Sequence, residues 1–337
     1  MSSQAIVILN YNGKAQLERY LPSVVATSPG WDIIVADNGS TDDSLDFLTA
    51  NYPSVKQRLL PVNVGFAQGY NDALAQLDGY TYYFILNSDV RLSENWDSPL
   101  LSFLEQHPEV AAVQPKILSD RKPDHFEHAG AAGGFVDLFY YPFCRGRLFA
   151  HCEEAQDQYP DAIRVSWTSG AAMLIRAHDF HAVNGFDGRF FAHMEEIDLC
   201  MRLGQNGRQF YCVPQATVWH YGGATLDYEN PQKSYLNFRN SLYMLVKNQQ
   251  KALLLVLFIR MCLDGIAALQ FLVKGKPNLL WQVFKAHMAL YQNFGVFYRE
   301  RQQASHSTYR YKGLIIWDYY AKGIRQFSQL NKRKFNS

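Results

Sequence analysis

Short apolar runs alternate with helix-like segments through the first 120 residues of the chain. The clearest runs are AIVILN (residues 5–10), DIIVADN (32–38) and YYFILN (82–87). Each is a continuous apolar stretch, as in strands that are buried on both faces of a sheet. The segment after the first run, residues 14–27, places apolar residues at helical spacing. This alternation predicts βαβ units, and we expect a doubly wound, mostly parallel α/β sheet.

Polar residues follow all three runs. The first ends in NYNG (residues 10–13), the second in ADNGS (36–40) and the third in NSD (87–89). Open α/β sheets bind ligands beyond the carboxyl ends of their strands, so these tips are expected on one shared rim. The side chains expected there are Asn10, Asn12, Asp37, Asn38, Asn87 and Asp89.

Two further helices are expected in this part of the chain. Ser40 or Thr41, followed by two aspartates, is suited to begin the second helix. The third helix is expected from about Gly69 to Leu77.

A polar loop with two glycines opens that third helix, in the stretch NVGFAQGYNDAL. Backbone N–H groups at such a helix start can bind a phosphate. Asn63, Gly65 and Asn71 are therefore candidates to bind a phosphate-containing ligand. No GxGxxG follows a strand, and no Gly-Lys is followed by Ser or Thr. A ligand on this rim would therefore be held by side chains and a metal ion, because a glycine-rich phosphate cradle is missing.

Two groups of ionisable residues could carry chemistry. Glu195, Glu196 and Asp198 crowd the first turn of a helix expected from Glu195 to Gln205, with Arg202 placed to pair with Asp198. They are either a capping cluster, since negative charge is favourable there, or a general base with a raised pKa. Asp89 could bind Mg²⁺ or Mn²⁺, or it ends an ordinary turn.

His220 follows a strand-like ATVW and is either structural or part of a metal or diphosphate site. Residues 119–165 lose periodicity and are rich in glycine and aromatic residues, so we expect an irregular, ordered insertion. Arg145, Arg147, Arg202 and Arg239 are candidates to contact an acceptor diphosphate, with solvated loop arginines as the alternative.

The region after residue 245 is expected to be a helical extension. Residues 252–273 are long enough to cross a bilayer, but Arg260 and Asp264 can pair on one face, which favours a surface-lying or partner-packed helix. From Arg310 to the end there are seven Lys or Arg and one acidic residue, together with many aromatics. We therefore expect residues 246–337 to associate with a membrane surface, and a homodimer through these helices is an alternative.

Charge and cysteine content restrict the partners and the compartment. The net charge of +1 gives no reason to expect nucleic acid. Five cysteines form no CxxC pair, which favours a reducing compartment over a disulfide framework. The first residues have no basic region before an apolar stretch and are interpreted as a strand. The expected location is cytoplasmic, on the inner face of the membrane.

Taken together, the motifs resemble the family 2 glycosyltransferases, inverting enzymes with a GT-A fold. The resemblance covers about residues 4–250, with a GT-A domain expected over residues 1–245 and the insertion on its acceptor side. The motifs that carry it occur in the family's order: VILNYNG, IIVADNGSTDDS, NVGFAQGYNDAL, FILNSDV, SGAAMLIR, GFDGRFFAHMEEIDLCMRLGQNG and VWHYGGAT. FILNSDV and MEEIDL look most like the branch that contains rhamnosyltransferases and other cell-envelope enzymes.

The resemblance implies a nucleotide-diphosphate sugar donor, such as dTDP-rhamnose or a UDP-hexose, and a divalent metal. It implies transfer to a glycan or lipid-linked acceptor in polysaccharide assembly. Asp37 would recognise the nucleotide and Asp89 would hold the metal, with Asn87 in place of the family's first Asp. The catalytic base would be Glu196, with Glu195 as the alternate. Asn87, and Glu196 where the family usually has an Asp, also support a rival, a non-catalytic nucleotide-sugar or glycan-binding scaffold.

Overall fold

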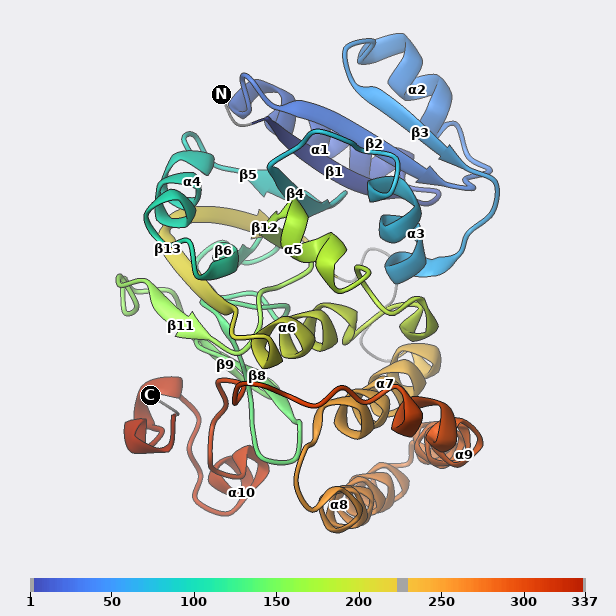
Figure 1. Cartoon of the computed structure of the whole chain (residues 1–337), viewed down its shortest axis with the longest axis vertical. Coiled ribbons are helices and arrows are strands. Elements are labelled where there is room, and N and C mark those ends of the chain that lie inside the picture. The colour runs from blue at the N-terminus through green and yellow to red at the C-terminus, as the bar shows by residue number, and fades with distance from the viewer. Residues whose placement is uncertain (1–2, 223–229, 336–337) are drawn as a thin grey trace.

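A computed structural model of the chain describes residues 3–222 and 230–335 (Figure 1). Its centre is a nine-stranded sheet, in which β5 (Val90–Leu92) pairs with one end of β13. The other strands, in spatial order, are β11 (Ile163–Val165), β13 (Gln209–His220), β6 (Val110–Ser119), β12 (Ala172–Arg176), β4 (Tyr82–Asn87), β1 (Gln4–Asn10), β2 (Asp32–Asn38) and β3 (Lys56–Leu60).

The α/β fold class is confirmed, with a sheet that is mixed. Strands β3, β2, β1 and β4 are parallel neighbours, as the alternation of runs predicts. The next strand, β12, is antiparallel to both β4 and β6, and β11 and β5 are antiparallel to β13. The run of four parallel strands therefore ends at β4, the strand whose tip carries Asn87, and a second parallel pair, β6 with β13, lies beyond β12.

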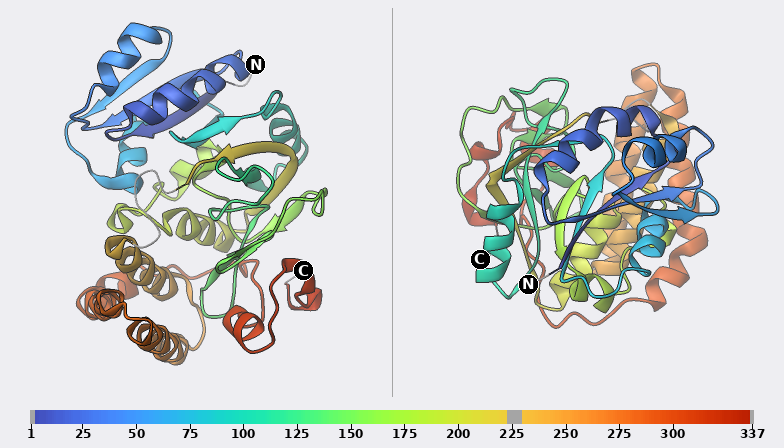
Figure 2. Two further views of the ribbon diagram at one scale, coloured as in Figure 1. Left: turned by 180° about the vertical axis from the view of Figure 1, so that it is seen from behind. Right: turned by 90° about the horizontal axis from the view of Figure 1, so that it is seen from above.

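Both faces of the sheet are covered. Along β1, Ala5 and Val7 enter one apolar cluster, and Ile6 and Ile8 enter the other, because successive side chains of a strand point to opposite faces. Figures 1 and 2 show α1 and α3 on opposite faces. The helices on one face are α1 (Lys14–Thr27), α2 (Ser44–Asn51) and α4 (Asp97–Gln106), and those on the other are α3 (Gly65–Leu74), α5 (Ala177–Ala182) and α6 (Glu195–Gln205).

Two predicted helix starts are wrong by a few residues. Helix α2 begins at Ser44, whose backbone N–H and hydroxyl both donate to Asp42, because Ser40 and Thr41 are taken up by the loop beside β1. Helix α3 begins at Gly65, four residues before the expected start. Its first N–H groups therefore lie closer to the sheet rim than the sequence predicts.

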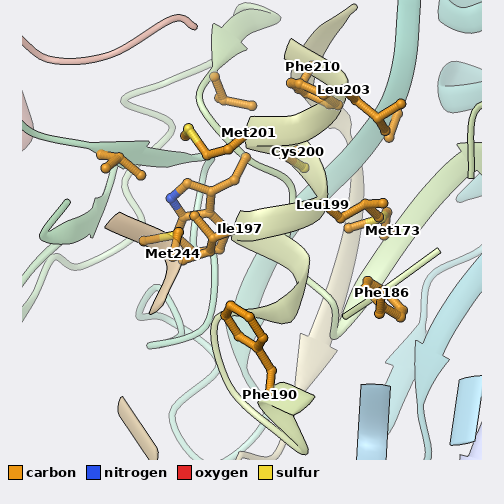
Figure 3. Packing of buried hydrophobic residues seen from close by; sticks show 14 of the residues in the cluster. Met173, Phe186, Phe190, Ile197, Leu199, Cys200, Met201, Leu203, Phe210 and Met244 are labelled. Carbon is orange, nitrogen blue, oxygen red and sulfur yellow. The ribbon is translucent and has the colours of Figure 1, made fainter. Parts of the chain in front are cut away.

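Helix α6 has the bounds that the sequence predicts, and it is buried on nearly all sides. Figure 3 shows Leu199 beside Met173 of β12, and Ile197 close to Met244 of the helix on the other side. A helix held between a sheet and a second helix is well fixed in position. The residues at its first turn are therefore fixed as well.

The insertion at residues 119–165 contains a second, antiparallel sheet, which the sequence did not predict. Its strands are β7 (Gly134–Val136), β8 (Pro142–Cys144), β9 (Arg147–Leu148) and β10 (His151–Cys152). The last part of the chain packs on this sheet. The rings of Phe327 and Phe335 lie 4.9 and 5.1 Å from that of Phe135, centroid to centroid, and Tyr311 N–H donates to the Val136 carbonyl at 2.9 Å.

This packing changes the interpretation of the basic, aromatic tail. Much of its aromatic content faces inward, whereas Trp317 and Tyr320, in and at the end of α10 (Ile315–Tyr320), remain exposed. All five cysteines are unpaired.

Three long helices form the end of the molecule farthest from β2 and β3 (Figure 1). They are α7 (Pro231–Asn248), α8 (Leu253–Val273) and α9 (Pro277–Arg299). The domain boundary expected after residue 245 falls inside α7, which packs against both α6 and α9. The domain division stays a prediction.

Candidate active site

The ends of β1 and β2 bring Asn10 and Asp37 together. These residues are direct partners in the parallel register, and both are buried. Asn10 Nδ2 donates to Asp37 Oδ2 at 2.9 Å, and Ser40 N–H donates to Asp37 Oδ1 at 2.8 Å. Asn10 Oδ1 is buried without a hydrogen-bond partner in the described part of the chain. The two strand tips thus form one polar corner, as predicted.

Asn12 shapes the loop next to this corner. Its backbone is in the left-handed region, with φ of 48°, which Asn tolerates better than most residues. Its Oδ1 accepts from Thr41 N–H at 2.7 Å and from Asp42 N–H at 3.3 Å, and its own N–H donates to Ser40 Oγ at 2.8 Å. Asn12 therefore fixes the β2–α2 loop against the β1 tip.

Asn38 and Asn63 hold the start of α3. Asn38 Nδ2 donates to Asn63 Oδ1 and to the Gly65 carbonyl, both at 3.1 Å, and Asn63 Oδ1 accepts from Gly65 N–H at 2.9 Å. Gly65 has φ of +86°, and a Cβ there would lie 2.5 Å from a ring carbon of Phe191. Only glycine fits, because the segment that leads into α6 lies directly against the start of α3.

Asn71 is a structural clamp at some distance from the rim. Its Nδ2 donates to the Phe186 carbonyl at 2.7 Å, and Phe186 N–H donates to its Oδ1 at 2.9 Å. Both polar groups of the amide are thus used to hold the loop before α6. A donor-binding role, as the sequence predicts for this residue, has no direct support in these contacts.

Asp89 and His220 meet at the end of β4, where β5 returns toward β13. His220 Nε2 lies 3.1 Å from Asp89 Oδ1 and 3.4 Å from Asn87 Nδ2. All three residues are buried or half-buried. The structure thus brings Asp89 and His220 together at this end of the sheet. The motif VWHYGGAT that includes His220 runs on into residues 223–229, which lie outside the described residues.

Glu127 joins this pair from the segment after β6, and the sequence did not single it out. His220 Nδ1 lies 3.2 Å from Glu127 Oε2, so the imidazole lies between two carboxylates. Burial alone would lower the pKa of His220, but the charges of Asp89 and Glu127 outweigh it and hold the pKa well above its ordinary value. Burial opposes ionisation of Glu127, yet the charge of His220 lowers its pKa to about 2. No sequence spacing links these positions, because only the sheet brings them together.

Glu195 and Glu196 form the first turn of α6. Glu195 is buried and Glu196 is partly exposed, and the Oε2 atom of each is buried without a hydrogen-bond partner among the described residues. Burial raises the pKa of Glu196 to about 7. Burial and the neighbouring charge of Glu196 raise the pKa of Glu195 well above its ordinary range. A carboxyl group with a raised pKa and an oxygen that accepts no hydrogen bond has the properties of a general base.

The backbone before Glu195 is strained, and Asn240 of α7 holds it. His193 and Met194 have φ of 71° and 72°. Non-glycine residues in this conformation cost free energy and are concentrated at functional sites. Asn240 Nδ2 donates to the carbonyls of Ala192 at 2.9 Å and His193 at 2.7 Å. Asn240 was not predicted, because a buried polar residue in a helix has no distinctive sequence signal.

The start of β12 lies between the Glu pair and the β4 tip. Asn87 N–H donates to the Ala171 carbonyl at 3.0 Å. A Cβ on the adjacent Gly170 would lie 3.6 Å from Glu196 Cβ and 3.5 Å from Phe66 of α3. Glu196, the start of α3 and the β4 tip are therefore neighbours across this short segment.

Asp198 has a different role from its neighbours on α6. Arg202 Nε donates to its Oδ2 at 2.7 Å, as the spacing predicts, and Lys247 Nζ donates to the same oxygen at 2.8 Å. Burial opposes ionisation, but these two cations hold the pKa of Asp198 below its ordinary value. Arg202 also donates to the Val183 and Gly185 carbonyls, so it is a structural residue.

The other three predicted arginines are dispersed. Arg145 is buried in the small sheet, where it donates to the Ala132 carbonyl at 2.8 Å. Arg147 donates to the Phe149 carbonyl at 2.8 Å. Arg239 lies beside the strained segment and donates to the Phe190 carbonyl at 2.9 Å. Of the three, Arg239 comes closest to the Glu pair, and the structure does not bring them together as one diphosphate site.

The residues on the rim fit a divalent metal that is shared with a bound diphosphate. Within residues 3–222 and 230–335, no three His, Cys, Asp or Glu side chains form a ready-made metal cage. Diphosphate-bound Mg²⁺ needs only one or two protein carboxylates, and a ligating His commonly has a carboxylate on its other nitrogen. His220 has Glu127 at Nδ1 and Asp89 at Nε2, so a metal held by Asp89 and His220 would take the place of the proton on Nε2, and Glu127 would remain on the other nitrogen.

Comparisons with solved structures support the fold. A crystal structure of GalNAc-T7 with UDP, GalNAc and Mn²⁺ superposes with a TM-score of 0.57 at 13% identity, over 88% of this chain and 58% of that one. The mannosyltransferase PcManGT from Pyrobaculum calidifontis, in complex with GDP-Man and Mn²⁺, gives a TM-score of 0.51 at 13% identity, over 86% of both chains. At this identity the likeness shows the GT-A fold alone.

Sequence comparisons give the family. The N-acetylglucosaminyl-diphospho-decaprenol L-rhamnosyltransferase of Mycobacterium tuberculosis (strain H37Rv) is 31% identical over 235 residues, which are 64% of this chain and 75% of the relative. Rhamnosyltransferase WbbL of Escherichia coli (strain K12) is 44% identical over 63 residues, 19% of this chain and 24% of the relative. The model of the family "Glycosyl transferase family 2" matches residues 5–176. The chain is a glycosyltransferase and belongs to glycosyl transferase family 2.

Proposed function

We propose that the protein transfers rhamnose from dTDP-rhamnose, with inversion, to a hydroxyl of a lipid-linked glycan in cell-envelope polysaccharide assembly. The names of its rhamnosyltransferase relatives support this donor and acceptor class. A UDP-hexose is the alternative donor. The non-catalytic scaffold that the sequence left open is not favoured, since the relatives are enzymes by name.

The observation that carries the proposal is the pair of unpaired, buried Oε2 atoms of Glu195 and Glu196. Glu196 is the base, because it is the more accessible of the two and its pKa of about 7 lies near neutral pH. It takes the proton from the acceptor hydroxyl while that oxygen bonds to the anomeric carbon. The bond from the anomeric carbon to the nucleoside diphosphate breaks on the opposite face. General-base catalysis of this kind contributes about 10² to 10⁴ in rate.

The corner formed by β1 and β2 is the proposed nucleotide site. The Asp37 carboxylate is fixed by Asn10 Nδ2 and by Ser40 N–H, which leaves it oriented to accept from a base or ribose. Asn38 and Asn63 fix the start of α3, where Gly65 N–H and its neighbours lie near the rim. Asn12 keeps the loop around the corner in place.

Asp89 and His220 would hold a divalent metal, with Asn87 beside them. When bound, the ion would stabilise the negative charge that develops on the leaving diphosphate. Glu127 would orient His220 through Nδ1, so that Nε2 faces Asp89. Because Asn87 is neutral, Asp89 supplies most of the protein's negative charge at this point.

We further propose that residues 1–245 form the catalytic domain, with residues 119–165 on the acceptor side and residues 246–337 as a membrane-associating extension. Arg239 is the arginine best placed to contact an acceptor, because its contacts lie on the segment that leads to the Glu pair. The proposed location is the cytoplasmic face of the membrane.

The test is hydrolysis of nucleotide sugars by the purified full chain. We expect slow release of nucleoside diphosphate from dTDP-rhamnose in the presence of Mn²⁺, with slower or no release from UDP- and GDP-sugars. Asp89→Ala should abolish metal-dependent release, while Asp78→Ala, at an exposed position remote from the rim, should not. Failure of every donor to bind or to be cleaved would refute the proposed reaction.

A further inference from the structure

Helix α8 has an exposed side that is almost entirely apolar. Leu254, Phe258, Leu269 and Leu272 lie on it, and the Leu254 side chain is 71% exposed. By length and composition, this is the one helix among the described residues that could cross a membrane, and 28% of its most apolar window is buried. A contiguous apolar patch on a soluble protein marks an interaction surface. We call this side of α8, with the exposed side of α9, the outer face.

Helix α9 continues the outer face. Trp281, Phe284 and Tyr291 are exposed, with Trp281 and Phe284 stacked at a ring-centroid distance of 5.0 Å. The two exposed sides meet in an open groove of about 520 Å³, where Leu254 of α8 and Tyr298 of α9 are both part of the wall. The apolar residues of the two helices therefore form one connected surface.

The charge around the outer face is strongly positive. Between residues 251 and 299 there are six basic residues and one acidic residue, Asp264. Asp264 is buried and paired with Arg260, so this pair is turned away from the outer face. Lys274 lies exposed at the turn that joins α8 to α9. A second copy of the chain would present the same positive charge, so the outer face is complementary to an anionic partner.

The inner side of α8 holds the helix against the protein. Arg260 Nε donates to Asp264 Oδ1 at 2.9 Å, and the same guanidinium donates to the Phe139 carbonyl and to Ser241 Oγ, both at 2.8 Å. Asp264 also accepts from the Tyr141 hydroxyl at 2.9 Å. A helix whose charged residues are bound to its own domain would have to break these contacts to cross a bilayer.

We propose that the outer face lies in the interfacial region of a membrane that contains acidic phospholipids. The apolar side chains of α8 and α9 enter the boundary between headgroups and acyl chains, and the basic residues around them bind phosphate headgroups. Helix α8 thus lies in the plane of the membrane surface and does not span it. This proposal rests on the proposed function and extends it by naming the surface that binds the membrane. Vesicle binding needs no sugar donor, and donor hydrolysis needs no vesicle. The membrane proposal and the proposed reaction can therefore fail independently.

The test is co-sedimentation of the full chain with vesicles of phosphatidylcholine, alone or mixed with phosphatidylglycerol. We expect binding to the mixed vesicles that weakens as salt is raised. The double variant Phe258→Glu, Leu269→Glu should lose at least about tenfold in partitioning, since charge is placed in the apolar surface. Lys274→Gln should lose roughly fivefold on the mixed vesicles only. Trp281 fluorescence, taken as the difference from a Trp281→Phe variant, should shift to the blue on binding.

The matched control is Leu59→Glu, because Leu59 on β3 is 65% exposed but lies at the other end of the molecule. It should bind vesicles as the wild type does, and all variants should retain donor hydrolysis. Binding to neither kind of vesicle, or equal binding to both, would overturn the proposal. A stable dimer in light scattering that the double variant dissociates would assign the face to a second copy. Resistance to alkaline carbonate extraction would show that α8 spans the membrane.

Discussion

The first turn of helix α6 carries two carboxyl environments that differ completely. Within residues 3–222 and 230–335, Glu195 and Glu196 have no cationic partner, and their pKa values are raised. Asp198 is fully buried but receives Lys247, Arg202 and the Asn248 amide, and its pKa is lowered. Glu195 and Asp198 are both buried, whereas Glu196 is partly exposed. Because Glu195 and Asp198 differ in the sign of the pKa shift at similar burial, the availability of a cation decides which carboxyl group is structural and which has a raised pKa.

The source of the cation explains the difference. Lys247 comes from the end of α7 and reaches both Asp187, at 2.6 Å, and Asp198, at 2.8 Å. Near the first turn of α6 the same helix presents Asn240, a neutral amide that holds backbone carbonyls. Helix α7 thus neutralises one end of the acidic cluster and fixes the backbone at the other. An unpaired buried carboxylate lowers stability, so its retention here is consistent with a chemical role.

The largest expected effect is on the unpaired carboxyl groups. Glu196→Gln keeps the shape of the side chain but removes the base, so kcat should fall by about 10² to 10⁴ while the fold is kept. The measurement is sugar transfer or donor hydrolysis under saturating donor, with circular dichroism to check folding. Glu195→Gln is the matched variant and should have the smaller effect. The reverse order would assign the base to Glu195.

The next largest effect is on the free energy of unfolding, when the cation paired with Asp198 is removed. Lys247→Met removes the cation that Asp187 and Asp198 share, and we expect a loss of about 3 kcal/mol in the free energy of unfolding. Urea denaturation measures it. Lys56→Met is the control, because the Lys56–Asp32 pair is exposed on both sides and should be worth less than about 1 kcal/mol. Equal losses in the two variants would show that burial of the pair is unimportant.

Glu127 is intermediate between the carboxyl groups with and without their own cation, because it shares the imidazole of His220 with Asp89. Glu127→Gln should weaken Mn²⁺ binding about 10- to 100-fold, because His220 would lose the partner that orients it. Electron paramagnetic resonance of free Mn²⁺ in the presence of donor measures the affinity directly. Glu154→Gln, at an exposed position beside the small sheet, should change nothing. Unchanged affinity in Glu127→Gln would remove Glu127 from the metal site.

The smallest effect is on the pH dependence of stability. The pKa of Glu196 is about 7 in the folded protein and near 4.5 when unfolded, so folding binds a proton between these values. Stability from this group is therefore present at low pH and lost as pH rises through about 7. Glu196→Gln should be more stable than the wild type at pH 8 and equal to it at pH 4, because the cost of ionising the buried group arises only at the higher pH. The same stability difference at both pH values would contradict the raised pKa.

Much of the catalytic half follows from local sequence. The continuous apolar runs predict three of the four parallel strands, β1, β2 and β4, and the polar tips predict the corner of Asn10 and Asp37. The bounds of α6 are predicted because its end has a clear glycine signal at Gly207, with φ of 88°. The starts of α2 and α3 were missed, since long-range contacts with Asn12 and Phe191 override local preferences there.

The roles of single polar residues were harder to predict. Arg145 and Asn71 looked like ligand contacts, but each is used to bind backbone carbonyls within the protein. Glu127 and Asn240 were overlooked because neither looked like a ligand contact in the sequence. Their importance comes from partners on other elements, and the sequence around them has no motif.

The sequence by itself determined the α/β class, the rim with Asp37 and Asp89, and the first turn of α6, because these depend on strand and helix periodicity along one continuous stretch. Only the tertiary structure decided the antiparallel strands beyond β4, the packing of the aromatic tail on the small sheet, and which carboxyl groups receive a cation. These depend on which distant segments meet. Charge pairing acts over a few ångströms in space, so no spacing along the chain can reveal that Lys247 reaches Asp198 and leaves Glu195 and Glu196 unpaired.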